Sequence, residues 1–340
     1  MAQATGTIKV VRVGVPLPGK EWAAQIAAAG GELTMVEARG EAEVIAATRD
    51  ADIIINAGAA FPASVIEHLE HCRLLIQSSV GYDRIDVPAA TARGIMVANL
   101  PDYCIEEVAE HALALLLAGA RRLPTMERLV RDGSWNSSPY TAIRDAIGPV
   151  QRLSQTTLGI VGFGKIGRLV ARKAGGIGWT ILAADPFVSA ETAAALGVQL
   201  VPLDDLLRRA DFVTLHVLLS PETRGLIGRR ELALMKPTAF LVNTCRGPIV
   251  DEPALIEALQ AGRLAGAGLD VFEHEPLALD SPLRHLPNVI LTPHMAVYSE
   301  QAIANWTREP FEEAVRVMGG RWPRGLVNRE LKERLTGYRD

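Results

Sequence analysis

The feature that most constrains the fold of this chain is the stretch TLGIVGFGKIGRLVARKAGGIGWTILAAD at residues 157–185. Its apolar run at 158–161 is typical of a buried strand. Three glycines follow at the spacing G-x-G-x-x-G: Gly162, Gly164 and Gly167. The first permits a tight turn, the second leaves room for a pyrophosphate, and the third lets the next helix pack closely on the sheet. That helix is predicted from about Lys165, and its free N–H groups and positive dipole end would face the phosphates.

A carboxylate completes this pattern. The second apolar run, at 179–184, ends at Asp185, which stands 18 residues after Gly167. At this distance a dinucleotide site needs an acceptor for the two hydroxyls of the adenosine ribose. Because strand, helix and acid are all in place, the glycines indicate a dinucleotide site rather than an ordinary loop. Asp185 would repel the 2′-phosphate of NADP, and residues 186–188 supply no arginine to bind it, so we predict NAD as the cofactor.

The length and composition of the whole chain set its broad class. Its 340 residues suggest about two domains, and 49% hydrophobic with 22% charged residues is ordinary for a globular protein. The net charge of −4 and the lack of a basic block argue against nucleic acid as a partner. Residues 1–17 do not resemble a secretion signal, and the longest apolar stretch, at 108–120, is too short to span a membrane. The three cysteines are far apart and form no metal-ligand pattern: Cys72, Cys104 and Cys245. We therefore expect a reduced, cytoplasmic protein without a metal site.

Strand-like and helix-like segments alternate along most of the chain. Strands are expected in the first hundred residues at 8–15, 32–36, 52–56, 74–78 and 95–98. The alternation resumes after the glycine motif, with further strands expected at 198–201, 212–216, 239–243, 266–269 and 289–291. This rhythm is typical of parallel sheets covered by helices on both faces. We predict an α/β fold of two Rossmann-like, doubly wound parallel-sheet domains, with a final helix from about 298 that returns to the first domain.

The region between the two sets of strands contains three segments of interest. Residues 99–102 interrupt the pattern and indicate a crossing between domains. A long, largely apolar helix is predicted at 106–122, and its His111 is interpreted as a packed core histidine rather than a ligand. Residues 133–156 are predicted to form an irregular loop that extends over a neighbouring subunit. Trp135 in this loop either anchors a dimer interface or packs on its own subunit.

Three polar residues each follow a predicted strand of the second sheet: Arg246, Glu275 and His294. The carboxyl ends of parallel strands share one edge of a sheet, so these side chains should meet near a bound nicotinamide. Reduction of a ketone by hydride requires a proton at the ketone oxygen, and a histidine suits this task. A neighbouring carboxylate would fix the tautomer of the imidazole and favour its protonated form. An arginine can hold a 2-keto acid by bidentate hydrogen bonds.

The first domain offers one turn where an anion could bind. Residues 79–83 follow a predicted strand end, and Gly81 would let main-chain N–H groups face an anion, although a plain tight turn fits the local sequence equally well. The loop at 56–61 has no Lys or Arg that would bind a phosphate. We therefore expect a small or apolar 2-keto acid as substrate, not a phosphorylated one.

Taken together, these stretches resemble the D-2-hydroxyacid dehydrogenase family over almost the whole chain. The matching stretches are SSVGYDRID (78–86), VAEHALALLLAGARR (108–122), LGIVGFGKIG (158–167), FLVNTCRGPIVDEPAL (240–255), GAGLDVFEHEP (266–276) and NVILTPH (288–294). The resemblance implies a substrate domain, at 1–100 plus 297–340, into which an NAD domain at 101–296 is inserted. It also implies a cleft between them and a homodimer formed through the NAD domain.

The resemblance also assigns roles to individual residues. Arg246 would bind substrate, Glu275 would orient the histidine, and His294 would be the acid–base group. Further residues would bind the cofactor: Gly162, Gly164, Lys165, Ile166, Gly167, Asp185, Thr244, Cys245 and Asp270, the last through the nicotinamide carboxamide. Main-chain N–H groups of Val80 and Gly81 would bind the substrate carboxylate.

Within the family, TPHMAVYSEQA at 292–302 resembles the C-terminal-binding-protein branch, whose animal members are NAD-sensing corepressors. That branch has a tryptophan before the tyrosine, where this chain has Val297. Two functions remain open: an NAD-dependent D-2-hydroxyacid dehydrogenase, or a regulatory scaffold that binds NAD(H) and partner proteins. The complete Arg–Glu–His set favours the enzyme. A formate-type dehydrogenase is disfavoured, because Glu275 stands where that group is expected to use glutamine.

Overall fold

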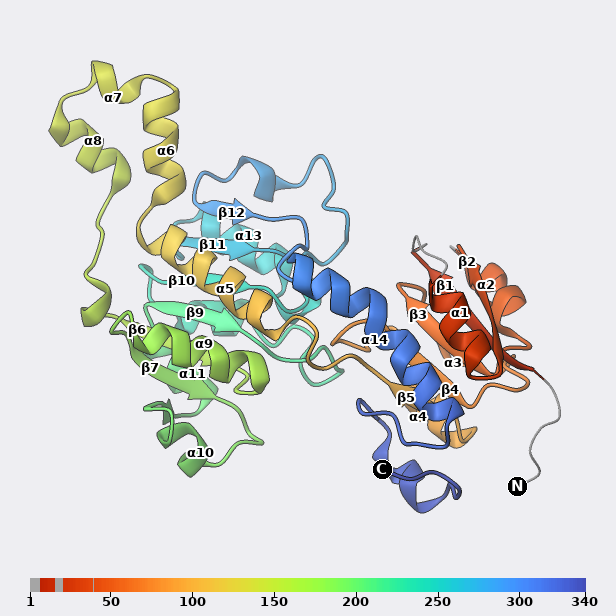
Figure 1. The fold of residues 1–340 in the computed structure, drawn as a ribbon. Helices are drawn as coiled ribbons and strands as arrows, with labels where there is room; N and C mark the ends of the chain where they lie inside the picture. Colours follow the sequence, from red (N-terminus) through yellow and green to blue (C-terminus); the bar gives the residue numbers. More distant parts are fainter. Residues whose placement is uncertain (1–6, 16–20, 39) are drawn as a thin grey trace. The chain divides into compact units, whose positions relative to one another are not determined.

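The computed structural model describes residues 7–15, 21–38 and 40–340. Residues 1–6, on which the expected lack of a secretion signal partly depends, lie outside the described residues. The chain divides into two compact units: unit 1, Met1–Tyr103 with Ser299–Asp340, and unit 2, Cys104–Tyr298 (Figure 1). Unit 2 is therefore inserted in the sequence of unit 1. The domain boundaries expected from the sequence differ from these by two or three residues.

Unit 1 is built on a five-stranded sheet of order β2-β1-β3-β4-β5, in which all neighbouring strands are parallel. The strands are β1 (Ile8–Gly14), β2 (Gly31–Val36), β3 (Ile53–Ala57), β4 (Leu74–Gln77) and β5 (Met96–Ala98). The helices are α1 (Glu21–Ala28), α2 (Glu41–Thr48), α3 (Ala63–Ile66), α4 (Val87–Ala92) and α14 (Glu300–Met318). Two separate apolar clusters cover the two faces, one around Phe61 and the other around Phe311. The central strand β3 is buried along its whole length because helices cover both faces.

Unit 2 is built on a seven-stranded parallel sheet of order β12-β11-β10-β9-β6-β7-β8. The strands are β6 (Thr157–Val161), β7 (Thr180–Ala184), β8 (Gln199–Leu200), β9 (Phe212–Leu215), β10 (Phe240–Asn243), β11 (Gly266–Leu269) and β12 (Val289–Leu291). The main helices against it are α5 (Ile105–Ala120), α9 (Lys165–Gly175), α10 (Ala190–Ala194), α11 (Leu203–Arg209), α12 (Arg229–Leu234) and α13 (Glu252–Gln260). The strand order reverses between β6 and β9, and ligands of doubly wound sheets bind at such a switch point. Both sheets confirm the predicted fold class.

An arm of three short helices follows α5: α6 (Leu123–Arg131), α7 (Ser134–Ser137) and α8 (Tyr140–Ile147). The prediction of an irregular loop at 133–156 is therefore wrong. Gly133, Pro139 and Gly148 stand at the ends of these helices, and Tyr140–Ile147 between the last two consists largely of residues that a helix accepts.

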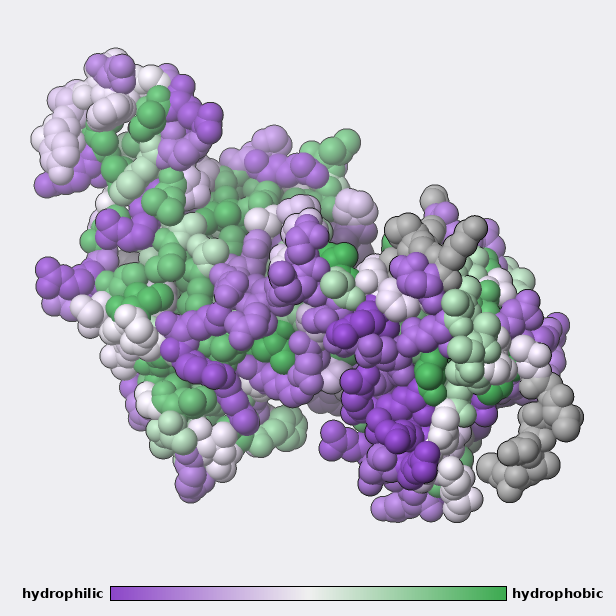
Figure 2. All heavy atoms as spheres, in the orientation of Figure 1, coloured by the Kyte–Doolittle hydropathy of each residue, from purple (hydrophilic) through white to green (hydrophobic). Residues whose placement is uncertain are grey.

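Large apolar side chains of this arm are exposed, and none of its three helices has a buried residue. Trp135 is 61% exposed and Tyr140 is 81% exposed. Apolar residues lie among polar ones over the arm in Figure 2. The exposure of Trp135 contradicts packing on its own subunit, so its role as a dimer anchor stays a prediction.

No helix among the described residues has the length and apolar character needed to cross a bilayer. No cluster of three or more His, Cys, Asp or Glu side chains in the described part of the chain is arranged to hold a metal ion.

Candidate functional site

The glycine turn after β6 shows a steric need for two of its three glycines, Gly162 and Gly167. Gly162 has φ +89°, and a Cβ at this position would lie 2.5 Å from the carbonyl oxygen of His216. A Cβ at Gly167 would lie 2.2 Å from the carbonyl oxygen of Gly162. At Gly164, by contrast, an added Cβ meets nothing within 4 Å, so the backbone there faces open space. Gly164 is also the N-cap of α9, and a phosphate could approach the first turn of this helix closely.

Asp185 lies directly after β7 and beside this turn. Its Oδ2 accepts a hydrogen bond from the N–H of Phe163 at 2.8 Å, and its Oδ1 accepts one from the N–H of Phe187 at 2.9 Å. These bonds fix the carboxylate against the glycine turn. Each oxygen has a further lone pair, which leaves acceptors for ribose hydroxyls. Lys165 and the half-buried Ile166 are the first two residues of α9 and follow the glycine turn directly. The residues present therefore fit a dinucleotide.

The turn after β10 carries three of the predicted residues and is held by Asn243, which the sequence did not single out. Asn243 is buried, and its Oδ1 accepts bonds from the N–H of Cys245 at 3.1 Å and from the Sγ of Cys245 at 3.0 Å. Its Nδ2 donates to the carbonyl of Arg246 at 2.9 Å. Burial raises the pKa of the Cys245 thiol to about 11, so this cysteine stays a thiol at neutral pH. The buried Oγ1 of Thr244 has no hydrogen-bond partner among the described residues.

Glu275 and His294 are in direct contact. The Nδ1 of His294 lies 2.7 Å from the Oε2 of Glu275, and the N–H of Phe272 donates to Oε1 of the same carboxylate at 3.0 Å. Burial alone would raise the pKa of Glu275. The hydrogen bonds from His294 and Phe272, with the charges of His294 and Arg246, outweigh burial and lower this pKa. The structure thus brings the three predicted residues to one edge of the unit 2 sheet.

The lowered pKa of Glu275 has a consequence for the acid stability of this edge. The carboxylate interacts better in the folded than in the unfolded chain. Its stabilising contribution is therefore present above the unfolded-state pKa and is lost as the pH falls through the lower folded-state pKa. At neutral pH Glu275 is ionised and accepts the hydrogen bond of His294.

The carboxylate of Asp270 is bonded to the segment that carries His294, and the contact of Asp270 with the nicotinamide stays a prediction. Asp270 is fully buried. Its Oδ1 accepts bonds from the hydroxyl of Thr292 at 2.6 Å and the N–H of Met295 at 3.0 Å, and its Oδ2 accepts one from the N–H of Ala296 at 2.9 Å. The N–H of His294 donates to the carbonyl of Asp270 at 2.8 Å. Asp270 therefore holds the segment on both sides of His294, whose φ is +55°.

His111 joins the same network, a contact that the sequence did not reveal. Its Nε2 lies 3.0 Å from the Oγ1 of Thr292 and 3.6 Å from Oδ1 of Asp270. The interpretation as a packed histidine rather than a ligand stays a prediction, to which the structure adds these polar contacts. A polar residue inside the apolar α5 was the available signal, but nothing local indicated a partner 181 residues away.

Val80 and Gly81 lie in unit 1, in the loop after β4. The carbonyl of Val80 accepts a bond from Nδ2 of Asn99 at 2.7 Å, and that of Gly81 accepts one from Oγ of Ser79 at 2.6 Å. The backbone N–H groups of both residues donate no hydrogen bond within the described part of the chain. They are therefore two donors available to an anion.

A further finding in unit 1 concerns the loop at 56–61. It contains no Lys or Arg, but Nη1 of Arg84 donates to the carbonyl of Gly58 at 2.7 Å. A guanidinium thus lies against this loop. The sequence of the loop therefore does not by itself exclude a phosphorylated substrate, contrary to the argument from the sequence.

The chain is similar to several known proteins, and these belong to the same class of dehydrogenases and reductases. Residues 113–296 match the sequence model of a family described as D-isomer specific 2-hydroxyacid dehydrogenase, NAD binding domain. A glyoxylate reductase of Korarchaeum cryptofilum is 44% identical over 277 residues, which are 81% of this chain and 82% of that protein. A D-3-phosphoglycerate dehydrogenase of Methanocaldococcus jannaschii is 38% identical over 321 residues, or 94% of this chain but 60% of the relative.

Among solved structures, a glyoxylate reductase from Paecilomyes thermophila superimposes with a TM-score of 0.85 at 26% identity, covering 95% of this chain and 99% of that one. The family description confirms NAD as the predicted cofactor. None of these descriptions carries a corepressor function, so the placement in the C-terminal-binding-protein branch stays a prediction.

Proposed function

Because this chain belongs to the D-isomer specific 2-hydroxyacid dehydrogenase family, we propose that it reduces a small, non-phosphorylated 2-keto acid of the glyoxylate type to the 2-hydroxy acid. The observation that carries this proposal is the 2.7 Å contact between Nδ1 of His294 and Oε2 of Glu275, on the sheet whose switch point holds the glycine turn. The ionised Glu275 holds the imidazole so that Nε2 is directed away from the carboxylate. That nitrogen makes no hydrogen bond within the described residues, so it is available to a substrate.

In the proposed reaction, a few residues bind the substrate and transfer the proton. NADH, which the glycine turn and Asp185 would hold, would supply a hydride to the carbonyl carbon. His294 donates a proton to the carbonyl oxygen, which becomes the hydroxyl, and Glu275 stabilises the imidazolium before this transfer. Arg246 holds the carboxylate and the carbonyl oxygen of the substrate, and the free N–H groups of Val80 and Gly81 bind a carboxylate oxygen.

The substrate class is tested by steady-state kinetics with NADH and a panel of keto acids: glyoxylate, pyruvate, hydroxypyruvate and phosphohydroxypyruvate. A glyoxylate reductase is among the relatives, and the match covers 82% of its length. We expect kcat/KM for glyoxylate to exceed that for phosphohydroxypyruvate at least tenfold. A preference for phosphohydroxypyruvate would instead assign Arg84 to a phosphate and overturn the proposed substrate class.

The preference for NAD over NADP is proposed to depend on Asp185. Its carboxylate is fixed by two backbone N–H groups and would repel a 2′-phosphate at close range. Wild-type protein should show a higher kcat/KM with NADH than with NADPH, and Asp185→Ser should reduce that ratio at least tenfold. Asp205→Ser, which removes an exposed carboxylate from α11 of the same unit, serves as the matched control. An unchanged ratio in Asp185→Ser would exclude this role.

We also propose a homodimer formed through the arm α6–α8, because its exposed apolar side chains need a partner surface. Sedimentation velocity of the full chain and of Trp135→Asp measures this directly, since a monomeric wild-type protein rules the dimer out. No observation favours the regulatory scaffold, which is therefore not proposed.

A further inference from the structure

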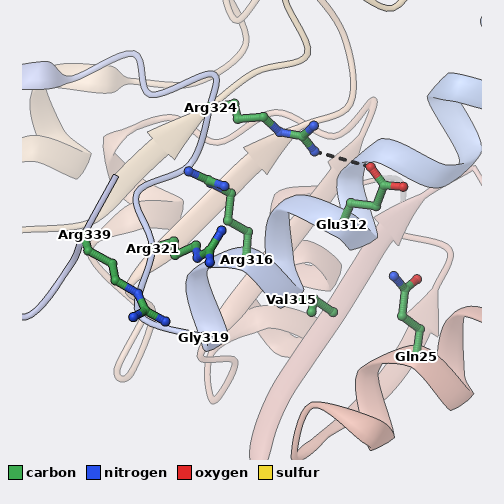
Figure 3. A pocket seen from close by; sticks show the side chains of 8 residues that line it. All are labelled: Gln25, Glu312, Val315, Arg316, Gly319, Arg321, Arg324 and Arg339. Atoms are coloured by element: carbon green, nitrogen blue, oxygen red, sulfur yellow. Dashed lines mark hydrogen bonds and ion pairs between the residues drawn. The ribbon is translucent and has the colours of Figure 1, made fainter.

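A pocket in unit 1 is lined by four arginines, and no residue of the proposed active site belongs to it. It has a volume of about 470 Å³ and lies between the C-terminal end of α14 and the last residues of the chain (Figure 3). The arginines are Arg316, Arg321, Arg324 and Arg339, and Glu312 and Gln25 also line the pocket. In the close-up, Arg316 and Arg321 lie between Arg324 and Arg339, while Gln25 lies on the far side of the pocket.

The carboxylates near this pocket do not balance its positive charge. Arg324 is paired with Glu313 through its Nε and with Glu312 through Nη2 at 3.3 Å. The side chains of Arg321 and Arg339 have no hydrogen bond or ion pair with any described residue. Two guanidinium groups of one pocket therefore lack a counter-charge from the described residues.

Arg316 contributes a third guanidinium to the pocket. Its Nε donates to the carbonyl of Trp322 at 2.6 Å, which fixes the side chain without a carboxylate. The neighbouring Asp340 is engaged elsewhere, because its Oδ1 lies 2.9 Å from Nζ of Lys332. Arg316 lies in the last turn of α14, where a cation complements the helix dipole, but Arg321 and Arg339 lie beyond the helix and have no such role.

The backbone holds the two unpaired arginines next to each other. Arg321 and Arg339 form a parallel β-bridge, in which the N–H of Trp322 donates to the carbonyl of Arg339 at 2.9 Å. The N–H of Arg339 in turn donates to the carbonyl of Gly320, also at 2.9 Å. The rings of the neighbouring residues Trp322 and Tyr338 pack with centroids 5.0 Å apart. Like charges in such a pair repel, and a bound anion would remove this repulsion without any rearrangement of the backbone.

We propose that this arginine pocket binds a small phosphorylated anion, at a site separate from the proposed active site. Guanidinium groups match the oxygens of a phosphate by paired hydrogen bonds, and three arginines without a carboxylate partner in the described part of the chain line this pocket. The volume is larger than one phosphate needs, so the rest of the ligand has room beside Gln25 and Glu312. The overall charge of −4 argues against nucleic acid as the occupant. This inference does not depend on the proposed reaction.

The test is isothermal titration calorimetry of the full chain with pyrophosphate, in the presence of saturating NADH so that the glycine turn is occupied. Wild-type protein should bind with submillimolar affinity and a stoichiometry of one per chain. The double variant Arg321→Ala/Arg339→Ala should raise Kd at least tenfold, because each lost arginine removes charge-assisted hydrogen bonds. Unchanged thermal unfolding of the variant will show that it is folded, and the single variant Arg339→Gln provides a milder change with the same expected direction.

A second double variant removes the same charge from elsewhere in unit 1. Lys9→Ala/Arg329→Ala changes two exposed cations that do not line the pocket and should leave Kd within twofold of wild type. The proposal is overturned if wild-type protein does not bind pyrophosphate at millimolar concentration. It is also overturned if both double variants weaken binding equally, since binding would then depend only on the net charge of the protein. A third contrary result would be that sodium sulfate at equal ionic strength competes as well as pyrophosphate.

Discussion

Replacing His294 with alanine is expected to lower kcat for keto acid reduction by at least about a hundredfold, the scale of one general acid–base group. The imidazole is the group whose Nδ1 lies 2.7 Å from Glu275, and its other nitrogen is available to a substrate oxygen. Without it, the developing alkoxide has no positioned proton donor. Steady-state kinetics with NADH and glyoxylate measure kcat, and quenching of tryptophan fluorescence measures whether NADH still binds.

The matched control is His285→Ala, which removes an exposed histidine of unit 2 outside the site and should leave kcat unchanged. NADH affinity should be similar in both variants, because neither position lies in the glycine turn. If His294→Ala retains turnover within a few-fold of wild type, another group donates the proton and the proposed mechanism fails.

Replacing Asp270 with asparagine is expected to destabilise the protein by about 1–3 kcal/mol, the cost of leaving a buried hydrogen-bonding group unsatisfied. The three groups that face its carboxylate are all donors: the hydroxyl of Thr292 and the N–H groups of Met295 and Ala296. Whichever way the amide turns, its NH₂ meets at least one of these donors. Since the same bonds position the segment that carries His294, kcat should also fall at least tenfold.

Urea denaturation gives the free energy of unfolding of this variant, and kinetics with saturating glyoxylate give kcat. Asp280→Asn makes the same chemical change at an exposed carboxylate of unit 2 and should alter neither quantity. A loss of stability without any change in kcat would show that Asp270 supports the fold but does not position His294.

Features with a local physical cause could be predicted from the sequence. Gly162, Gly164 and Gly167 lie within a turn of six residues, and Gly162 and Gly167 have the steric reasons that the spacing indicated. Asp185 follows a strand of predictable length. The helices of the arm were missed because the stretch 133–156 was interpreted by its average composition, although Tyr140–Ile147 alone has helix-forming residues between two capping positions.

Contacts between residues far apart in the sequence could not be predicted from the sequence. The carboxylate of Asp270 is bonded to residues 22 to 26 positions later, and His111 meets Thr292 across 181 positions. Arg84 donates a hydrogen bond to the carbonyl of Gly58, although nothing in the sequence around either residue indicates this contact. The cluster of arginines at the end of α14 likewise requires the backbone bridge between Arg321 and Arg339.

The amino-acid sequence alone determined the two parallel sheets, the dinucleotide turn and the order in which Arg246, Glu275 and His294 follow their strands. These features depend on hydrophobic periodicity and on short-range sterics, which act between residues close in the chain. Only the tertiary structure decided that Asp270 is a buried acceptor for the His294 segment and that two unpaired arginines stand side by side. Hydrogen bonds and charge repulsion act over a few ångströms in space, and the packing of the whole unit decides which distant groups come within that range.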